Sequence, residues 1–412
     1  MGLHGATLGT RFLFIFFLAK NLDPSLVGYY GLFTVTVGYS LYFVGLDFYT
    51  YATRELLNTP IEQRGRMLKG QVALSGVLYL LFLPVAMALL LQFSGWPQYL
   101  LWWFVPILIL EHFNQEMFRL LIALSEQISA SVILFIRQGS WALAAVALMA
   151  WDPAARNLQN VMALWALAGI AAAGAAIWKL RRLHMGGWRA AVDWSWIRKG
   201  IAISTAFLLS TLALRGIQTF DRYLLEALGG IDIVGAYVLF FGVAGTLLTF
   251  LDAGIFAFTY PILIKLQQAQ ETDVARAKVR RMFGLTIVLS AGFGLVTWFL
   301  LPYLLVWIDK PVYTGSINLY GWLLTATIIN AISMVPHYAL YAAGCDRPII
   351  RSHIAALIVF LSVTWMLSGR LSALAVPIGL NLSFALILVW KYASYWRLDQ
   401  SKAGPAPAPQ TT

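Results

Sequence analysis

The sequence predicts an all-α integral membrane protein with about twelve transmembrane helices. Hydrophobic residues make up 60% of the chain and charged residues only 11%, whereas an ordinary soluble domain carries about 25% charged residues. The chain also holds twelve apolar runs of membrane-spanning length. Finally, lysine and arginine are concentrated in alternate connections between these runs. The lipid bilayer is therefore the first predicted partner.

The twelve runs define the predicted helices in chain order. They cover residues 2–20, 26–48, 70–92, 98–119, 129–150, 158–178, 200–221, 232–260, 282–303, 316–343, 349–368 and 371–391. The first run lacks a convincing small-residue cleavage site and leads into the second, which favours a helix over a signal peptide. Because twelve is an even number, both termini are expected on the same side of the membrane.

The distribution of basic residues predicts the orientation. If the N-terminus is cytoplasmic, 21 basic residues lie in inside connections, among them Arg119 and Lys391, and five lie outside. The five are Lys20, Arg156, Arg222, Lys310 and Arg370. Cationic loops near helix ends resist translocation, so both termini are expected in the cytoplasm. Loops facing an anionic leaflet also account for the net charge of +11, and nucleic acid is not expected as a partner.

The longest basic connection predicts the domain organisation. "WKLRRLHMGGWRAAVDWSWIRKG", residues 178–200, mixes arginine with tryptophan, as interfacial segments do. It predicts a six-helix lobe over 1–178, a cytoplasmic or interfacial linker over 179–199 and a second six-helix lobe over 200–396. The tail, residues 397–412, contains the low-complexity "AGPAPAPQTT" and is expected to be disordered.

Two similarities between the halves predict an internal repeat. "VGYYGLF" at 27–33 resembles "VGAYVLF" at 234–240, and Asp47 and Asp252 follow at comparable distances. Six helices per half is an even number, so both halves would enter the membrane from the same side. The two lobes are therefore expected to be parallel repeats, related by a pseudo-two-fold axis along the membrane normal.

Three arginines, Arg11, Arg137 and Arg215, lie inside the apolar runs. A lipid-facing arginine costs about 2.5–3.5 kcal/mol at the bilayer centre on insertion scales, so such residues usually face a cavity or a partner. Guanidinium groups match phosphate oxygens, and a cavity that contains several of them suits a phosphate or diphosphate. The alternative is that each arginine pairs with a buried carboxylate such as Glu111 or Glu116.

The fourth run, "ILEHFNQEMFRLL", places several polar side chains on one helical face. Either they form a structural seam of ion pairs and hydrogen bonds between helices, or Glu111 or His112 carries a coupling proton. The candidate coupling or gating residues are Asp47, Glu111, His112, Glu116 and Asp252. His337, which follows Pro336, is interpreted as structural. The coupling ion, H⁺ or Na⁺, stays open.

The sequence lacks the motifs that several classes of protein function need. No zinc-ligand spacing or Walker-type phosphate loop is present, and the single Cys345 excludes an internal disulfide. The chain is therefore expected to use no metal or other cofactor. The external connections are short, which disfavours a membrane enzyme, so the chain is expected not to be an enzyme.

Three segments resemble a known transporter family. "FRLLIALSEQISASVILFIRQGSW" at 118–141, "RFLFIFFLAKNLDPSLVGYYGLF" at 11–33 and "DRYLLEALGGIDIVGAYVLFFG" at 221–242 are similar to polysaccharide-transporter flippases. These belong to the MOP exporter superfamily, which includes the MATE extruders. The resemblance implies a two-lobed, twelve-helix protein in the bacterial cytoplasmic (inner) membrane. It would flip an undecaprenyl-diphosphate-linked oligosaccharide, such as an O-antigen repeat unit, through a cationic cavity, in partnership with polysaccharide polymerase machinery. Arg11, Arg137 and Arg215 are the candidates for binding the diphosphate.

Two other transporter types fit parts of the pattern. A MATE-like ion-coupled exporter of drugs or small solutes would share the fold, but it would use a more acidic or apolar cavity. A major-facilitator transporter would also have six plus six helices. Its basic motif is only faintly suggested by "EQRGRM" at 62–67.

Overall fold

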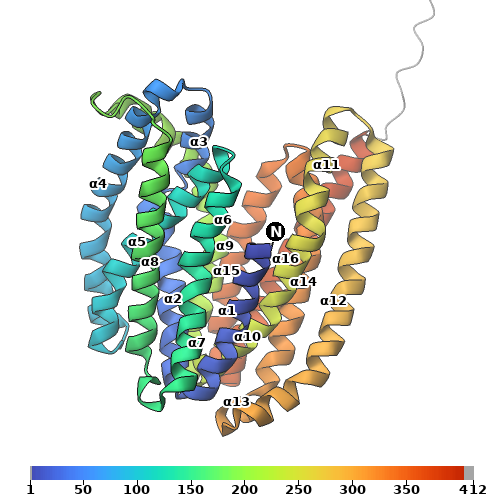
Figure 1. Cartoon of the computed structure of the whole chain (residues 1–412). Helices are drawn as coiled ribbons and strands as arrows, with labels where there is room; N and C mark the ends of the chain where they lie inside the picture. The colour runs from blue at the N-terminus through green and yellow to red at the C-terminus, as the bar shows by residue number, and fades with distance from the viewer. Residues whose placement is uncertain (1, 403–412) are drawn as a thin grey trace, which may run out of the picture. The chain divides into compact units, whose positions relative to one another are not determined.

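A computed structural model describes residues 2–402, and this part of the chain is helical with short connections and no strands (Figure 1). The helices up to the middle of the chain are α1 (Gly2–Asn21), α2 (Pro24–Gly45), α3 (Tyr49–Leu57), α4 (Ile61–Phe93), α5 (Gln98–Ala123), α6 (Gln127–Phe135), η1 (Ile136–Ser140), α7 (Trp141–Trp151), η2 (Pro153–Ala155), α8 (Leu158–Arg182) and α9 (Trp194–Gly229).

The remaining helices continue the same pattern of long rods and short turns. They are α10 (Ile231–Leu251), η3 (Asp252–Phe256), α11 (Ala257–Gln268), α12 (Thr272–Ile308), α13 (Pro311–Gly315), α14 (Ile317–Ala342), α15 (Asp346–Leu371), η4 (Ser372–Leu374) and α16 (Ala375–Lys402). Each of the twelve predicted runs overlaps one of these helices or one continuous series of them.

Length and apolarity identify the membrane-spanning segments. Within residues 2–402, seven helical segments are long and apolar enough to cross a membrane, and two bent helix pairs raise the number to nine. One of the seven, Asp346–Gln400, contains both α15 and α16. The protein is therefore a multi-pass membrane protein.

Local sequence explains where several helices begin or break. Pro24 begins α2, where its missing N–H costs nothing. Leu46 and Asp47, which follow α2, both have φ of 50°, and the chain bends by 53° between α2 and α3. The segments η1 and η3 are π-helical turns inside two long apolar rods. Such turns occur often at functional sites, and these two contain Arg137 and Asp252.

Internal contacts divide the chain into two compact units, Met1–Arg215 and Gly216–Thr412. In the first, α5 packs against α8 and α2, and in the second α16 packs against α14 and α15. The division falls within α9, later than the predicted linker at 179–199, and the predicted lobe boundaries stay a prediction. The predicted disordered tail is partly wrong, because α16 continues to Lys402. Residues 403–412 lie outside the described residues.

The segment before α9 packs on the N-terminal end of α4, which is predicted to face the cytoplasm. The amide of Gly65 donates to the Gly186 carbonyl oxygen over 2.7 Å, and a Cβ on Gly186 would lie 2.6 Å from the Glu62 carbonyl oxygen. Asp193 caps α9 by accepting from the Trp196 amide at 3.0 Å. Hydrogen bonds from the Ser195 side chain and the Trp196 amide lower the pKa of the Asp193 carboxyl. The predicted linker is thus fastened to the first unit.

The predicted orientation can be tested by cysteine labelling of the segment before α9. In a Cys345→Ser background, Ala190→Cys is expected to resist a membrane-impermeant maleimide in intact cells and to react once the membrane is opened. The matched variant Lys310→Cys, in a predicted external connection, is expected to react in intact cells. Labelling of the cysteine at 190 from outside would contradict cytoplasmic termini.

Candidate functional site

Arg137 and Glu111 form a buried ion pair in the first unit. Arg137 Nε donates to Glu111 Oε2 over 2.8 Å, and its Nη2 reaches the same oxygen. Trp165 Nε1 donates to the other oxygen, Oε1, over 2.8 Å. The carboxylate is therefore engaged at both oxygens, and the charge of Arg137 is neutralised. This is the pairing that the sequence left open as the alternative to phosphate binding.

The polar face of α5 continues towards the C-terminal end of the helix, which is predicted to face the cytoplasm. Glu116 accepts from Arg119 Nη1 over 2.7 Å and from Gln71 Nε2 over 2.6 Å. The Arg119 guanidinium lies 3.6 Å from the ring centroid of Tyr49. Arg119 was predicted as the last residue of the run 98–119 and counted with the inside connections. It lies within α5, which continues to Ala123, and these neighbours hold its side chain. The seam is thus a network of paired groups.

His112 and Asp47 lie near the break between α2 and α3. Nδ1 of the buried His112 is 2.7 Å from the Tyr79 hydroxyl, whereas its Nε2 has no hydrogen-bond partner. A Cβ on Gly45 would lie 3.0 Å from that nitrogen. The buried Asp47 carboxylate accepts a hydrogen bond from Thr211 and interacts electrostatically with Arg215. The site candidates of the first unit therefore differ in how fully they are paired.

Arg11 is the candidate with the most available charge. Its side chain is exposed in the apolar helix α1, and Nη1 lies 3.4 Å from Gln138 Oε1. The Tyr30 hydroxyl is a second neutral neighbour. Among the described residues, no carboxylate forms an ion pair with Arg11. Arg215, in α9, is also exposed.

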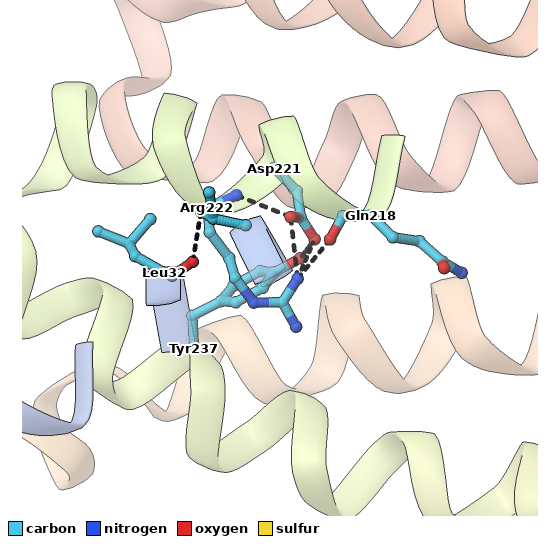
Figure 2. Close-up of polar contacts among 6 residues, drawn as sticks. Leu32, Gln218, Asp221, Arg222 and Tyr237 are labelled. Atoms are coloured by element: carbon cyan, nitrogen blue, oxygen red, sulfur yellow. Dashed lines mark hydrogen bonds and ion pairs between the residues drawn. The ribbon is translucent and has the colours of Figure 1, made fainter. Parts of the chain in front are cut away.

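Asp221 and Arg222 form a second buried ion pair, in the second unit (Figure 2). Neighbouring helix positions normally face apart, but here Arg222 Nη1 turns back to the Gln218 carbonyl oxygen at 2.6 Å and to Asp221 Oδ1 at 3.0 Å. Tyr237 donates to Asp221 Oδ2 over 2.5 Å. Asp221 is fully buried, and Arg222 is 6% exposed. Arg222 was expected in an external connection, and it lies instead inside the α9–α10 contact.

This pair is expected to stabilise the second unit. Asp221→Ala leaves a buried guanidinium without its carboxylate and should lower the free energy of unfolding by about 3–5 kcal/mol. Tyr237→Phe removes one hydrogen bond to a charged group and should cost about 1.5–3 kcal/mol. Thermal unfolding in detergent checks this order, with Asp232→Ala, an exposed acid of α10, as control. An Asp221→Ala protein as stable as the control would show that the pair contributes nothing to folding.

Asp252 has an open environment in the second unit. It begins η3, its side chain is exposed, and the Tyr338 hydroxyl donates to Oδ1 over 3.2 Å. The rings of Phe256 and Tyr260 lie 5.3 Å and 5.5 Å from that of Tyr338. Asp252 is thus an exposed carboxylate beside an aromatic cluster.

Sequence reasoning missed a basic cluster in the same unit. Lys391 was predicted as the last residue of the run 371–391 and counted with the inside connections, but α16 continues to Lys402 and Lys391 is 2% exposed. Its Nζ is 3.2 Å from His337 Nδ1, and the His337 ring stacks on that of His353 at 6.2 Å. The only available signal was that Lys391 directly follows the apolar run "ALILVW". The cluster joins α14, α15 and α16.

Comparisons with known proteins identify the fold. No family model matches the chain, and no curated protein matches it. An inward-facing multidrug resistance MATE family transporter of the MOP superfamily superposes with a TM-score of 0.81 at 10% identity, over 97% of this chain and 96% of that one. An outward-facing MATE transporter gives a TM-score of 0.65 at 11% identity, over 98% and 94%.

A third structure is a MOP superfamily transporter from Pyrococcus furiosus, with a TM-score of 0.61, 10% identity and 98% and 94% coverage. Its description reports a binding pocket of reverse polarity that suggests a different function for that protein. All three likenesses extend over nearly the whole chain, so they confirm the predicted fold class. This chain is an all-α, multi-pass membrane protein whose two-lobed, twelve-helix arrangement is the fold of the MATE transporters of the MOP superfamily.

Proposed function

We propose that the protein is a flippase that moves an undecaprenyl-diphosphate-linked oligosaccharide from the cytoplasmic to the outer leaflet of a bacterial inner membrane. The transporter fold supports movement of a solute across the bilayer by alternating access. The sequence resemblance to polysaccharide transporters supports the lipid-linked glycan. The O-antigen repeat is one such glycan, and the polymerase machinery would use the flipped product.

The proposal rests mainly on the exposure and the neutral surroundings of Arg11. This guanidinium is exposed within an apolar helix, and its neighbours, Gln138 and Tyr30, are neutral. An arginine at membrane depth needs a wet or anionic environment. A diphosphate would supply the missing negative charge and would match the forked donors. Arg215 would act as a second cation, because it too is exposed in an apolar helix.

Arg137 has a different role in this proposal. Its ion pair with Glu111 already satisfies the guanidinium, so a diphosphate would have to displace a carboxylate. We assign Arg137 to positioning, since its η1 turn also contains Gln138, the neighbour of Arg11. Diphosphate binding then rests on Arg11 and Arg215.

Coupling would use the residues whose polar atoms are least satisfied. In the first unit, His112 has an unpartnered Nε2 and lies close to the break that contains Asp47. In the second, Asp252 is exposed. Glu111 and Glu116 are held by cationic and neutral donors and would respond only if those contacts open. Either H⁺ or Na⁺ could occupy such carboxylates.

One observation favours the alternative, a MATE-like ion-coupled exporter of drugs or small solutes. Asp252 is an exposed carboxylate beside Tyr338, which packs with Phe256 and Tyr260. An acid next to aromatic rings suits an organic cation. The two functions therefore place the substrate on different charges: Arg11 for an anionic lipid and Asp252 for a cation.

A deletion strain separates the two functions. Loss of a flippase should cause undecaprenyl-diphosphate-linked oligosaccharide to accumulate on the cytoplasmic side, and the wild-type gene should reverse this. Loss of a drug exporter should instead raise sensitivity to organic cations without lipid-linked intermediates. Normal intermediate levels together with cation sensitivity would overturn the flippase proposal.

A further inference from the structure

A pocket of about 250 Å³ lies within the second unit, between α12, α14 and α16. Arg276 and Arg280 of α12, Pro336 of α14, and Tyr392 and Trp396 of α16 line it. The predicted apolar runs begin at 282 on α12 and end at 391 on α16. The pocket therefore lies at the predicted cytoplasmic boundary of the membrane, and the proposed transport function does not use it.

The two arginines of the pocket differ in their partners. Arg276 Nε is 2.5 Å from Asp399 Oδ1, its Nη2 donates to the Asp399 carbonyl oxygen over 3.0 Å, and its Nη1 is 3.2 Å from Asp273. Arg280, one turn further along α12, is exposed, and no described residue forms a hydrogen bond or ion pair with it. In the pocket, Arg276 is therefore neutralised and holds the wall in place, whereas Arg280 is available to bind an anion.

The rest of the lining is apolar and aromatic. Tyr392 and Trp396 lie one turn apart on α16 and remain 52% and 59% exposed. Phe283 and Val279 of α12 form the apolar side. Tyrosine and tryptophan at this level of a membrane protein usually meet lipid headgroups. The pocket combines a free cation with an apolar lining, which suits an amphiphile that has an anionic head.

We propose that this pocket binds an anionic phospholipid of the cytoplasmic leaflet, with the phosphate on Arg280 and the glycerol and first chain carbons against Phe283, Tyr392 and Trp396. At about 250 Å³ the pocket is too small for a whole lipid, so only the phosphate and glycerol part would enter it. The acyl chains would continue into the bilayer. A free phosphate would use Arg280 but leave the aromatic lining unused.

Native mass spectrometry of the full-length protein with phosphatidylglycerol, phosphatidylcholine or inorganic phosphate tests the proposal. The wild type is expected to retain phosphatidylglycerol in preference to phosphatidylcholine, and excess phosphate should not displace it. Arg280→Ala should weaken phosphatidylglycerol binding about tenfold, the loss expected for one contact to a charged group. Arg281→Ala removes the same charge from the neighbouring exposed position outside the pocket and should change binding less than about twofold.

Two further variants test the geometry. Arg280→Lys keeps the charge and should retain part of the preference, and Trp396→Ala should weaken both lipids. Equal losses for Arg280→Ala and Arg281→Ala would overturn the proposal, because the basic cluster would then act without a pocket. Displacement of phosphatidylglycerol by inorganic phosphate would overturn it in favour of a free-phosphate site. Gel filtration of each variant, with Arg280→Lys as the folded reference, excludes unfolding as the cause.

Discussion

Arg11→Ala is expected to abolish flipping while leaving the protein folded and abundant in the membrane. The guanidinium has neutral neighbours, so its removal breaks no ion pair. If it binds the substrate diphosphate, its loss should reduce transport by about 30-fold or more. Arg11→Lys should retain part of the activity, because the charge survives but the fork that matches phosphate does not. Arg215→Ala should act in the same direction.

Transport and membrane abundance must be measured together in this series. Arg370→Ala is the matched control, since this exposed arginine lies in the last turn of α15 and was predicted in an external connection. It should transport normally. Full transport by a well-expressed Arg11→Ala protein would remove Arg11 from the substrate site. Low abundance of that variant would instead indicate a packing role.

Glu111→Ala is expected to be the most destabilising single change in the first unit. It leaves the guanidinium of Arg137 buried without a carboxylate and removes the acceptor of Trp165. Breaking a buried ion pair from one side costs about 3–5 kcal/mol, whereas replacing both partners with apolar residues is often neutral. The double variant Glu111→Met with Arg137→Met should therefore recover most of the lost stability.

An exposed ion pair of the same unit provides the control. Glu126 lies 2.8 Å from Lys179, and both side chains are partly exposed. Glu126→Ala should cost no more than about 1 kcal/mol. Thermal unfolding of the four proteins gives the comparison. If Glu111→Ala is as stable as Glu126→Ala, then Arg137 is not held by Glu111 in the membrane, and Arg137 returns as a candidate for diphosphate binding.

Much of the fold could be predicted from the sequence because the bilayer imposes a minimum length on every apolar run. All twelve runs overlap helical segments, including the closely spaced runs 349–368 and 371–391. Helix ends were predicted less well. Hydropathy falls at a charged residue, but the hydrogen-bonded backbone continues past it. The predicted helix ends at Arg119 and Lys391 and the predicted connection at Arg222 therefore lie within longer helices.

The site could be predicted only as a set of residue types. Spacing along one helix placed Glu111, His112 and Glu116 on a common face, and the structure engages all three there. The choice between phosphate and carboxylate for Arg137 depended on Glu111, 26 residues away on another helix, which no local pattern can fix. The π-helical turns at Arg137 and Asp252 also left no signal in the apolar periodicity.

The most direct test of the central claim is a flipping measurement with the purified protein. Proteoliposomes would carry a fluorescent undecaprenyl-diphosphate-linked oligosaccharide, and a membrane-impermeant quencher would report its exposure on the far leaflet. We expect the wild type to accelerate flipping, Arg11→Ala not to accelerate it, and a cationic dye not to be transported. Transport of the dye by the wild type, with no acceleration of the lipid-linked oligosaccharide, would contradict the flippase proposal.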